Sequence, residues 1–151
     1  MTVIKQSMIQ RIQTIYLFIA FTIAAVLTNV LSFFTTEKDG EIFLFNTLTH
    51  NSVLLKSVGV FFVISSILSI FSIVSFKKRQ NQFVANRINI LTNFYLLSVL
   101  VYVSLMLPGE MQISEKGIGI YFPIAIVVLL VMANKAIKKD EDLVKSVDRI
   151  R

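Results

Sequence analysis

The stretch Lys77-Lys78-Arg79-Gln80-Asn81-Gln82-Phe83-Val84-Ala85-Asn86-Arg87 separates two long apolar runs, residues 53–76 and 88–107. Each run is close to the ~20 apolar residues that a helix needs to cross the core of a bilayer. The stretch between them is rich in Lys and Arg, and short loops of this kind are retained on the cytoplasmic side of a membrane. We therefore expect a cytoplasmic loop over residues 77–87 between two membrane-spanning helices.

Two further apolar runs flank this pair, at about residues 12–34 and 121–137, in a chain of 151 residues that is 55% hydrophobic and 16% charged. Soluble domains carry more charge than this. Pro108-Gly109 cannot continue the helix before it, and Pro123 suits the first turn of the helix after it. We expect one domain, residues 1–151. It is an all-α membrane protein with four transmembrane helices at about residues 12–34, 53–76, 88–107 and 121–137.

The distribution of positive charge predicts the orientation of these four spans. With both termini and the loop 77–87 inside, only Lys38, Lys56 and Lys116 lie outside. The other 12 of the 15 Lys and Arg residues are then inside, which is the bias that insertion into a membrane produces. The inside residues are Lys5, Arg11, Lys77, Lys78, Arg79, Arg87, Lys135, Lys138, Lys139, Lys145, Arg149 and Arg151.

Each of the two outer loops contains a turn signal between short β-prone segments. Glu37-Lys38-Asp39-Gly40 lies between residues 31–36 and 41–46, and Glu115-Lys116-Gly117 lies between residues 111–114 and 118–122. Both patterns are typical of short β-hairpins, which could pair with each other on the same side of the membrane. An irregular loop that dips into the headgroups is an equal alternative for the first of them.

Ser65, Ser69 and Ser72 fall on one face of the second span, at positions i, i+4 and i+7. Small hydroxyl side chains let a neighbouring helix approach closely and form hydrogen bonds, so we interpret this set as a helix-packing face. A path for a solute is the alternative interpretation.

The last segment, residues 135–151, contains neither Gly nor Pro, so we expect a cytoplasmic tail helix that continues span four. Glu141 and Lys145 form a favourable i,i+4 pair, and Leu143, Val147 and Ile150 form an apolar stripe. Acidic side chains in this segment argue against simple binding to anionic lipid, so we favour a protein surface as the contact of the stripe. They are Asp140, Glu141, Asp142 and Asp148. A partner protein is slightly favoured over the basic loop 77–87 of the same molecule.

Polar side chains gather at the cytoplasmic ends of spans one, three and four. Amides at this level can bind each other, while Arg and Lys can hold lipid phosphate or pair with acidic groups. Ordinary interfacial anchoring explains much of the set, and a docking surface for a partner is the sharper interpretation. The candidate docking or lipid-headgroup surface comprises Gln10, Arg11, Gln13, Asn86, Arg87, Asn89, Asn134, Lys138, Asp140, Glu141, Leu143, Val147 and Ile150.

The sequence contains no pattern that indicates catalysis or a cofactor. It has no Cys, and its one His, His50, lies in an outer loop without a nucleophile motif and is expected to be solvated. It has no glycine loop for phosphate and no cluster of metal ligands. The spans lack ionisable residues in their middles, which proton-coupled transporters normally carry. We expect no enzyme, cofactor or metal, and we attribute the net charge of +6 to membrane insertion and lipid contact, with no nucleic acid.

Three segments of the chain resemble the Bacteroidetes membrane family DUF4293, a family of unknown function. Met8-Ile9-Gln10-Arg11-Ile12-Gln13-Thr14 is similar to its opening signature, Asn86-Arg87-Ile88-Asn89 to its central one, and residues 133–151 to its closing one. The resemblance implies a four-helix protein of the bacterial inner (cytoplasmic) membrane without assigned catalytic residues. Family members often begin at the residue that matches Met8, so residues 1–7 are either an extension or the product of a different start site.

These features together favour a non-catalytic accessory or scaffold subunit of a larger inner-membrane complex. It would contact membrane lipids and other membrane or cytoplasmic subunits, and it would dock through its cytoplasmic face and tail. The alternative is a small transporter or lipid-binding membrane protein that uses the Ser65, Ser69 and Ser72 face.

Overall fold

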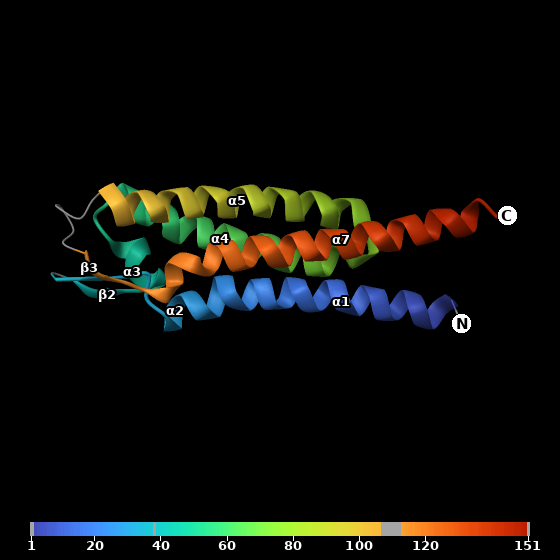
Figure 1. Ribbon diagram of the computed structural model, residues 1–151, viewed down its shortest axis with the longest axis horizontal. Coiled ribbons are helices and arrows are strands. Elements are labelled where there is room, and N and C mark those ends of the chain that lie inside the picture. Colours follow the sequence, from blue (N-terminus) through green and yellow to red (C-terminus); the bar gives the residue numbers. More distant parts are fainter. Residues whose placement is uncertain (1, 38, 107–112, 151) are drawn as a thin grey trace.

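A computed structural model describes the backbone of residues 2–37, 39–106 and 113–150, and the side chains of residues 12–37, 39–105 and 116–150. The molecule contains four long helical rods. They lie side by side along its longest axis (Figure 1). The first comprises α1 (Thr2–Thr22), a π-helical turn (Ile23–Leu27) and α2 (Thr28–Val30). The others are α4 (Val53–Val74) with a 3-10 turn (Ser75–Lys77), α5 (Arg79–Met106) and α7 (Phe122–Asp148).

All four rods are long and apolar enough to cross a membrane, judged by length and composition among the described residues. The qualifying segments are Ile12–Val30, Val53–Lys77, Arg79–Leu105 and Ile118–Asp148. Their outward faces are apolar, as Phe18, Phe71 and Phe94 illustrate with about half of each side chain exposed. Because a soluble protein does not expose apolar side chains along the whole length of its helices, these faces are typical of contact with lipid.

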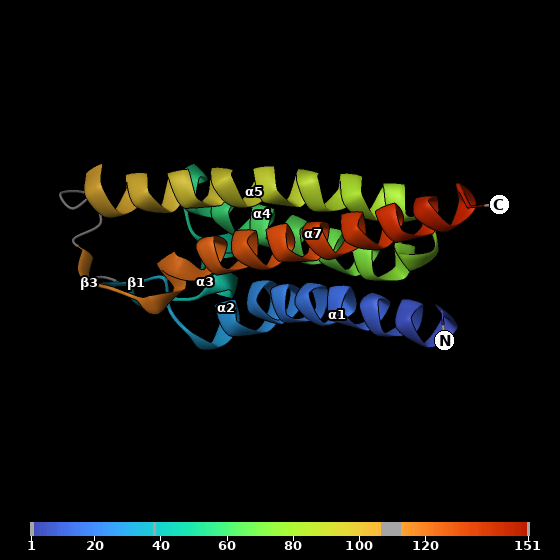
Figure 2. The same ribbon diagram turned by 45° about the vertical axis from the view of Figure 1, so that its right-hand side comes forward.

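The four rods form a closed ring in which α1 packs against α4 and α7, and α5 packs against the same two helices. Both chain termini lie at one end of this bundle, together with the Lys78 link between the 3-10 turn and α5 (Figures 1 and 2). We call this the termini end. The first turns of α1 and the last turns of α7 project past the α4–α5 link in both views.

The opposite end carries a three-stranded antiparallel sheet with strand order β2-β1-β3, and we call it the sheet end. Its strands are β1 (Phe34–Thr36), β2 (Gly40–Ile42) and β3 (Ile113–Lys116). A short helix, α3 (Leu44–Thr49), follows β2 and packs on α4. Gly40, with a φ of +70°, makes the β1–β2 turn in a conformation that favours glycine.

A close backbone contact joins the two outer segments at the sheet end. Gly117 N–H donates to the carbonyl of Phe33 (2.9 Å), and Gly119 N–H donates to that of Ser32 (3.1 Å). A Cβ at position 117 would lie 2.1 Å from the carbonyl oxygen of Ser32, so only glycine fits there. The start of span four is therefore held against the end of span one.

Several expected boundaries were wrong. Residues 77–87 are mostly helix, because α5 begins at Arg79 and its polar side chains find partners inside the bundle. Span one ends at Val30, and residues 34–36 form β1. Of residues 41–46, only the first two belong to a strand, since α3 begins at Leu44.

The second expected hairpin does not occur among the described residues. Residues 118–121 form a 3-10 turn that leads directly into α7, because Gly119 packs closely on Phe33 and Pro123 favours the first turn of a helix. Residues 111 and 112 lie outside the described residues. Residues 113–116 instead pair with β1, which supplies the third strand of the sheet.

Candidate functional site

The core of the bundle is polar in the half nearer the termini end. Seven hydroxyl and amide side chains meet there between α4, α5 and α7, and we call this set the amide seam. Its α5 members recur at spacings of three and four residues, so they share one helix face. All but Asn134 are completely buried, and Asn134 is half-buried. The members are Ser65, Ser69, Ser72, Asn86, Asn89, Asn93 and Asn134.

Hydrogen bonds within the seam join α4 to α5. Ser65 Oγ donates to Asn89 Oδ1 (2.6 Å), and Asn89 Nδ2 donates to Ser69 Oγ (3.0 Å). Asn93 Nδ2 donates to Ser65 Oγ (3.0 Å) and to Asn89 Oδ1 (3.0 Å). The α4 members of the seam are all serines. Because serine side chains are small, the backbones of α4 and α5 can approach closely enough for these bonds to form.

A second set of bonds extends the seam to α7. Ser72 Oγ donates to Asn86 Oδ1 (2.7 Å), and Asn86 Nδ2 donates to Asn134 Oδ1 (3.0 Å). Three helices are thus joined through one amide. Because these donors and acceptors are used within the bundle, the seam acts as a lock between helices and offers few free groups to a passing solute.

The seam ends near the middle of the bundle. Asn93 lies 14 residues after Arg79, or about 21 Å along the axis of α5. Towards the sheet end the same α5 face continues with Leu96, Leu100 and Val103, which are buried among apolar side chains. Phe62 on α4 stacks there on Phe33 with ring centroids 5.3 Å apart. The amide seam is therefore closed by apolar side chains at its inner end.

At the termini end, several buried polar atoms have no hydrogen-bond partner among the described residues. They are Nε2 of Gln13, Oε1 of Gln82 and both carboxylate oxygens of Asp140, and a further one, Oδ1 of Asn93, lies at the inner end of the seam. Nη2 of Arg79 lies 2.9 Å from Oδ2 of Asp140, close enough for an ion pair but without the alignment of a hydrogen bond. Asp140 is 1% exposed and Arg79 is 25% exposed, so this pair connects the start of α5 to the tail of α7.

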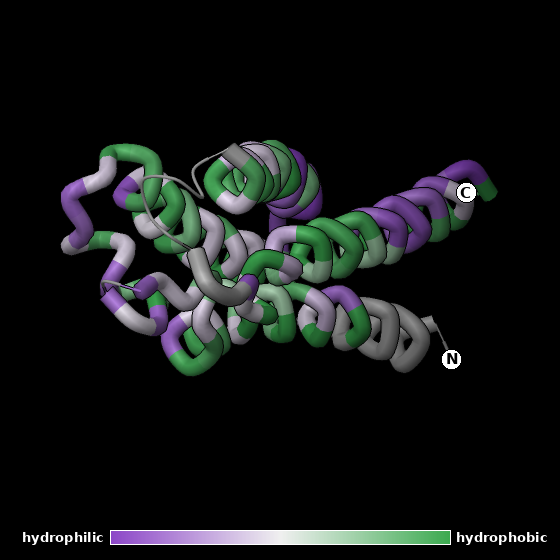
Figure 3. Tube along the Cα trace, turned by 60° about the vertical axis from the view of Figure 1, so that its left-hand side comes forward, coloured by the Kyte–Doolittle hydropathy of each residue, from purple (hydrophilic) through white to green (hydrophobic). Residues whose placement is uncertain are grey.

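Beyond Asp140, α7 leaves the bundle and its side chains are exposed, except for the half-buried Val144. Figure 3 shows the change along α7 from hydrophobic residues to hydrophilic ones towards the C-terminus. Nζ of Lys145 lies 2.7 Å from Oε1 of Glu141, in an exposed pair one turn apart. Leu143, Val147 and Ile150 are 43%, 54% and 87% exposed, which leaves the apolar stripe of the tail without cover.

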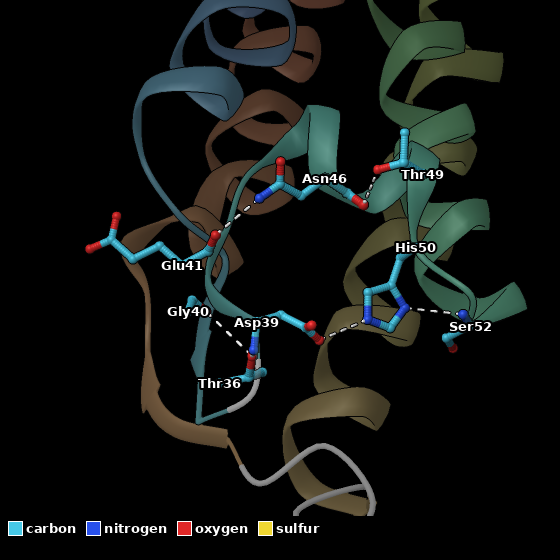
Figure 4. Close-up of polar contacts among 8 residues, drawn as sticks. All are labelled: Thr36, Asp39, Gly40, Glu41, Asn46, Thr49, His50 and Ser52. Atoms are coloured by element: carbon cyan, nitrogen blue, oxygen red, sulfur yellow. Dashed lines mark hydrogen bonds and ion pairs between the residues drawn. The ribbon is translucent and has the colours of Figure 1, made fainter.

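A smaller polar group lies at the sheet end (Figure 4). His50 Nδ1 accepts the backbone N–H of Ser52 (3.0 Å), so a neutral ring carries its proton on Nε2, which lies 3.4 Å from Asp39 Oδ2. Thr36 Oγ1 accepts the N–H of Asp39 (3.1 Å), which holds the turn before β2. His50 was expected to be solvated, but its side chain is only 21% exposed because it joins the β1–β2 turn to the start of α4.

These groups do not form a metal centre. Among the side chains of residues 12–37, 39–105 and 116–150, no three of His, Cys, Asp or Glu lie close enough together to hold a metal ion. A hollow of about 440 Å³ beside His50 is lined by Asp39, Asn46, Thr49 and Asn51. The contacts of His50 with Asp39 and Ser52 join the β1–β2 turn to the start of α4.

The structure divides the expected docking surface into a buried part and an exposed part. Gln13, Asn86, Asn89 and Asp140 are buried, so placing them on a surface was wrong; the closed ring turns their faces inward. The exposed members are Arg87, Lys138, Glu141, Leu143, Val147 and Ile150.

Some sequence-based expectations cannot be compared with the structure, and some site residues were missed. The side chains of Gln10 and Arg11 lie outside the described residues. Arg79, Gln82 and Asn93 were missed as site residues, although the spacing of residues 82, 86, 89 and 93 on one helix face was a usable signal.

The architecture is that of a multi-pass helical membrane protein whose bundle is joined by an internal amide seam. The chain belongs to the family DUF4293, described as a domain of unknown function, which matches residues 9–150. Neither the curated proteins nor the solved structures contain a match to this chain.

Proposed function

We propose that this protein is a non-catalytic accessory or scaffold subunit of a larger protein complex in the bacterial inner membrane. It docks through its termini end, which faces the cytoplasm. The observation that carries the proposal is the tail of α7, where Leu143, Val147 and Ile150 form an exposed apolar stripe beyond the bundle. A charged helix gains nothing in water from such a stripe, so a covering partner accounts for it.

The base of the tail is suited to presenting this stripe. Asp140 is buried and pairs with Arg79, so the tail leaves the bundle from an anchored turn. An anchored helix loses less conformational entropy on binding than a free peptide does. The partner is a protein with a complementary apolar helix face. This face would contact the stripe, whose residues occupy positions i, i+4 and i+7 of the tail helix.

The orientation is part of the proposal. Twelve of the 15 Lys and Arg residues lie on the side of the termini in the four-span topology, which is the cytoplasmic side by the positive-inside rule. Reporter fusions after Arg151 and beside Asp39 should report opposite compartments. Activity of a periplasm-only reporter after Arg151 would overturn the orientation.

The alternative is a small transporter or lipid-binding protein that uses the Ser65, Ser69 and Ser72 face. That role needs an open face, whereas all three side chains are completely buried and joined by hydrogen bonds to α5 or to their own helix. The accessory-subunit proposal has the better support because its surface is exposed.

The docking test replaces Val147 and Ile150 together by Asp and measures accumulation in the membrane and co-purifying proteins. The matched control is Arg149→Asp, which changes the net charge by the same amount but lies off the stripe. Loss of stoichiometric partners at normal accumulation, in the double variant alone, is the expected result. Unchanged partners would show that the stripe is a solvated extension and would remove the basis of the proposal.

A further inference from the structure

A groove lies between α1 and α7 near the termini end. It has a volume of about 350 Å³ and is lined by Ile12, Tyr16, Met132, Lys135, Ala136 and Lys139. Its floor is apolar, and both of its charged lining residues are exposed lysines on α7. They follow shortly after Val131 and Met132, and the next exposed large apolar side chain of α7 is Leu143. The groove therefore lies where the apolar band of the bundle meets its charged end.

A second hollow of about 420 Å³ adjoins the first, since Lys135 and Lys139 line both. It adds Lys138, Asp142, Leu143 and Ser146 to the lining. The two hollows together form a recess. Its floor, in the first hollow, is apolar, and Lys135, Lys138 and Lys139 form a basic rim. Lysine stems can cover apolar surface while their ammonium groups stay at the polar boundary.

The tertiary structure changes the charge balance of this rim. Asp140 is turned inward against Arg79, and Glu141 is paired with Lys145. Among the described residues, Lys135, Lys138 and Lys139 take part in no ion pair. Asp142 is the one acidic side chain in the lining, so the rim is positive although the segment looks mixed in sequence.

We propose that this recess binds one anionic glycerophospholipid. Its acyl chain lies along Ile12, Tyr16 and Met132, and its phosphate lies between Lys135 and Lys139. An apolar floor at membrane depth selects a lipid over a soluble anion, and the unpaired lysines select a negative headgroup over a zwitterionic one. Leu143 lines the second hollow and also belongs to the stripe. The residues placed against the acyl chain and the phosphate do not, so the lipid site can be tested separately from the docking of the tail.

The chain has no Trp, so Tyr16→Trp introduces a single fluorescent reporter into the groove. The variant is reconstituted in phosphatidylcholine vesicles that contain brominated phosphatidylglycerol or, separately, brominated phosphatidylcholine. We expect the brominated phosphatidylglycerol to quench the reporter more strongly at equal mole fraction. Phe71→Trp, at a half-exposed phenylalanine on the outer face of α4, is the control reporter and should be quenched equally by both lipids.

The lysines are tested with two double variants of equal charge change. Lys135→Gln with Lys139→Gln should reduce the preference for phosphatidylglycerol by on the order of five-fold for each lysine, from about 1 kcal/mol per basic residue. Lys77→Gln with Lys78→Gln, two exposed lysines at the same end of the bundle, should leave the preference unchanged. Equal loss in both double variants would mean a general surface potential and would overturn the site.

Two further measurements complete the test. Inorganic phosphate, added at constant ionic strength, should not relieve quenching by brominated phosphatidylglycerol; relief would assign the lysines to a free anion. Native mass spectrometry of the unsubstituted chain should show retained phosphatidylglycerol, and this readout does not depend on the folding of a tryptophan variant. Equal quenching by the two lipids at Tyr16→Trp, or no retained anionic lipid, would refute the proposal.

Discussion

The two halves of the bundle core are filled by different chemistry. Near the termini end, α4 and α5 meet through buried serine and asparagine side chains. Near the sheet end the buried core holds Phe62, Leu96 and Leu100, and Tyr95 Oη donates to Ser57 Oγ (3.1 Å) at its exposed edge. In lipid, an apolar side chain gains little by moving from the outside of a helix to the inside. In the sheet half, the helices are therefore held together by the complementary shapes of their apolar side chains. In the termini half, hydrogen bonds specify which helix faces meet.

The difference between the halves also separates the roles of the two ends. The sheet half is closed by β1, β2 and β3 and by the close contact of Gly117 with Ser32. The termini half opens to charged side chains, unpartnered amide atoms and the projecting tail. Rigid packing at one end and polar, exposed groups at the other make the termini end the place where partners and lipids can act.

The largest effect is expected in the apolar half. Phe62→Ala removes a completely buried ring that stacks on Phe33, and such substitutions cost about 3–5 kcal/mol of the free energy of unfolding. The measurement is unfolding in mild detergent by titration with a denaturing detergent. Phe71→Ala, at a half-exposed ring on the same helix, is the control, and an equal loss in both variants would contradict shape-specific packing.

The next effect is expected at the boundary of the amide half. Arg79→Gln leaves the Asp140 carboxylate buried without its cation, which would cost 3–5 kcal/mol in a dry interior. Because the side chain of Arg79 is 25% exposed, we expect a smaller loss of about 1–3 kcal/mol in the same unfolding assay. Adding Asp140→Asn should restore most of it, whereas a double variant no more stable than Arg79→Gln would show that the pair does not act through charge.

A smaller effect is expected within the seam. Asn89→Leu removes bonds to Ser65, Ser69 and Asn93, and at ~0.6 kcal/mol for an average side-chain hydrogen bond in a membrane protein the loss should be about 2 kcal/mol. Asn81→Leu, at an exposed position of α5, is the control. Combining Asn89→Leu with Ser65→Ala should cost less than the sum of the two, since these side chains are hydrogen-bonded to each other and removing both leaves neither of them orphaned by the other.

The smallest effect is expected in the exposed tail. Glu141→Gln removes the ion pair with Lys145, but both side chains are at least half exposed, so solvent and salt screen the interaction. The unfolding free energy should not change measurably at low or at high salt. A salt-dependent loss would show that the pair is part of the anchored base and not of the solvated tail.

The sequence is sufficient to predict the elements that depend on local pattern. Four apolar runs predict four spans because their lengths match a bilayer, and the absence of Gly and Pro after residue 134 predicts the unbroken helix α7. The spacing of Ser65, Ser69 and Ser72 predicts a packing face, since residues at i, i+4 and i+7 share one side of a helix.

The tertiary structure decided everything that depends on the register between distant segments. Asn86 meets Ser72 and Asn134 only because α4, α5 and α7 are aligned in one ring, and residues 113–116 reach β1 only because spans one and four end side by side. Asp140 resembles its acidic neighbours in sequence but is buried against Arg79, so it does not neutralise Lys135, Lys138 or Lys139, which form no ion pair within the described part of the chain. Local pattern specifies which face a side chain occupies on its own helix, whereas its partner is specified by the packing of helices that are far apart in the chain.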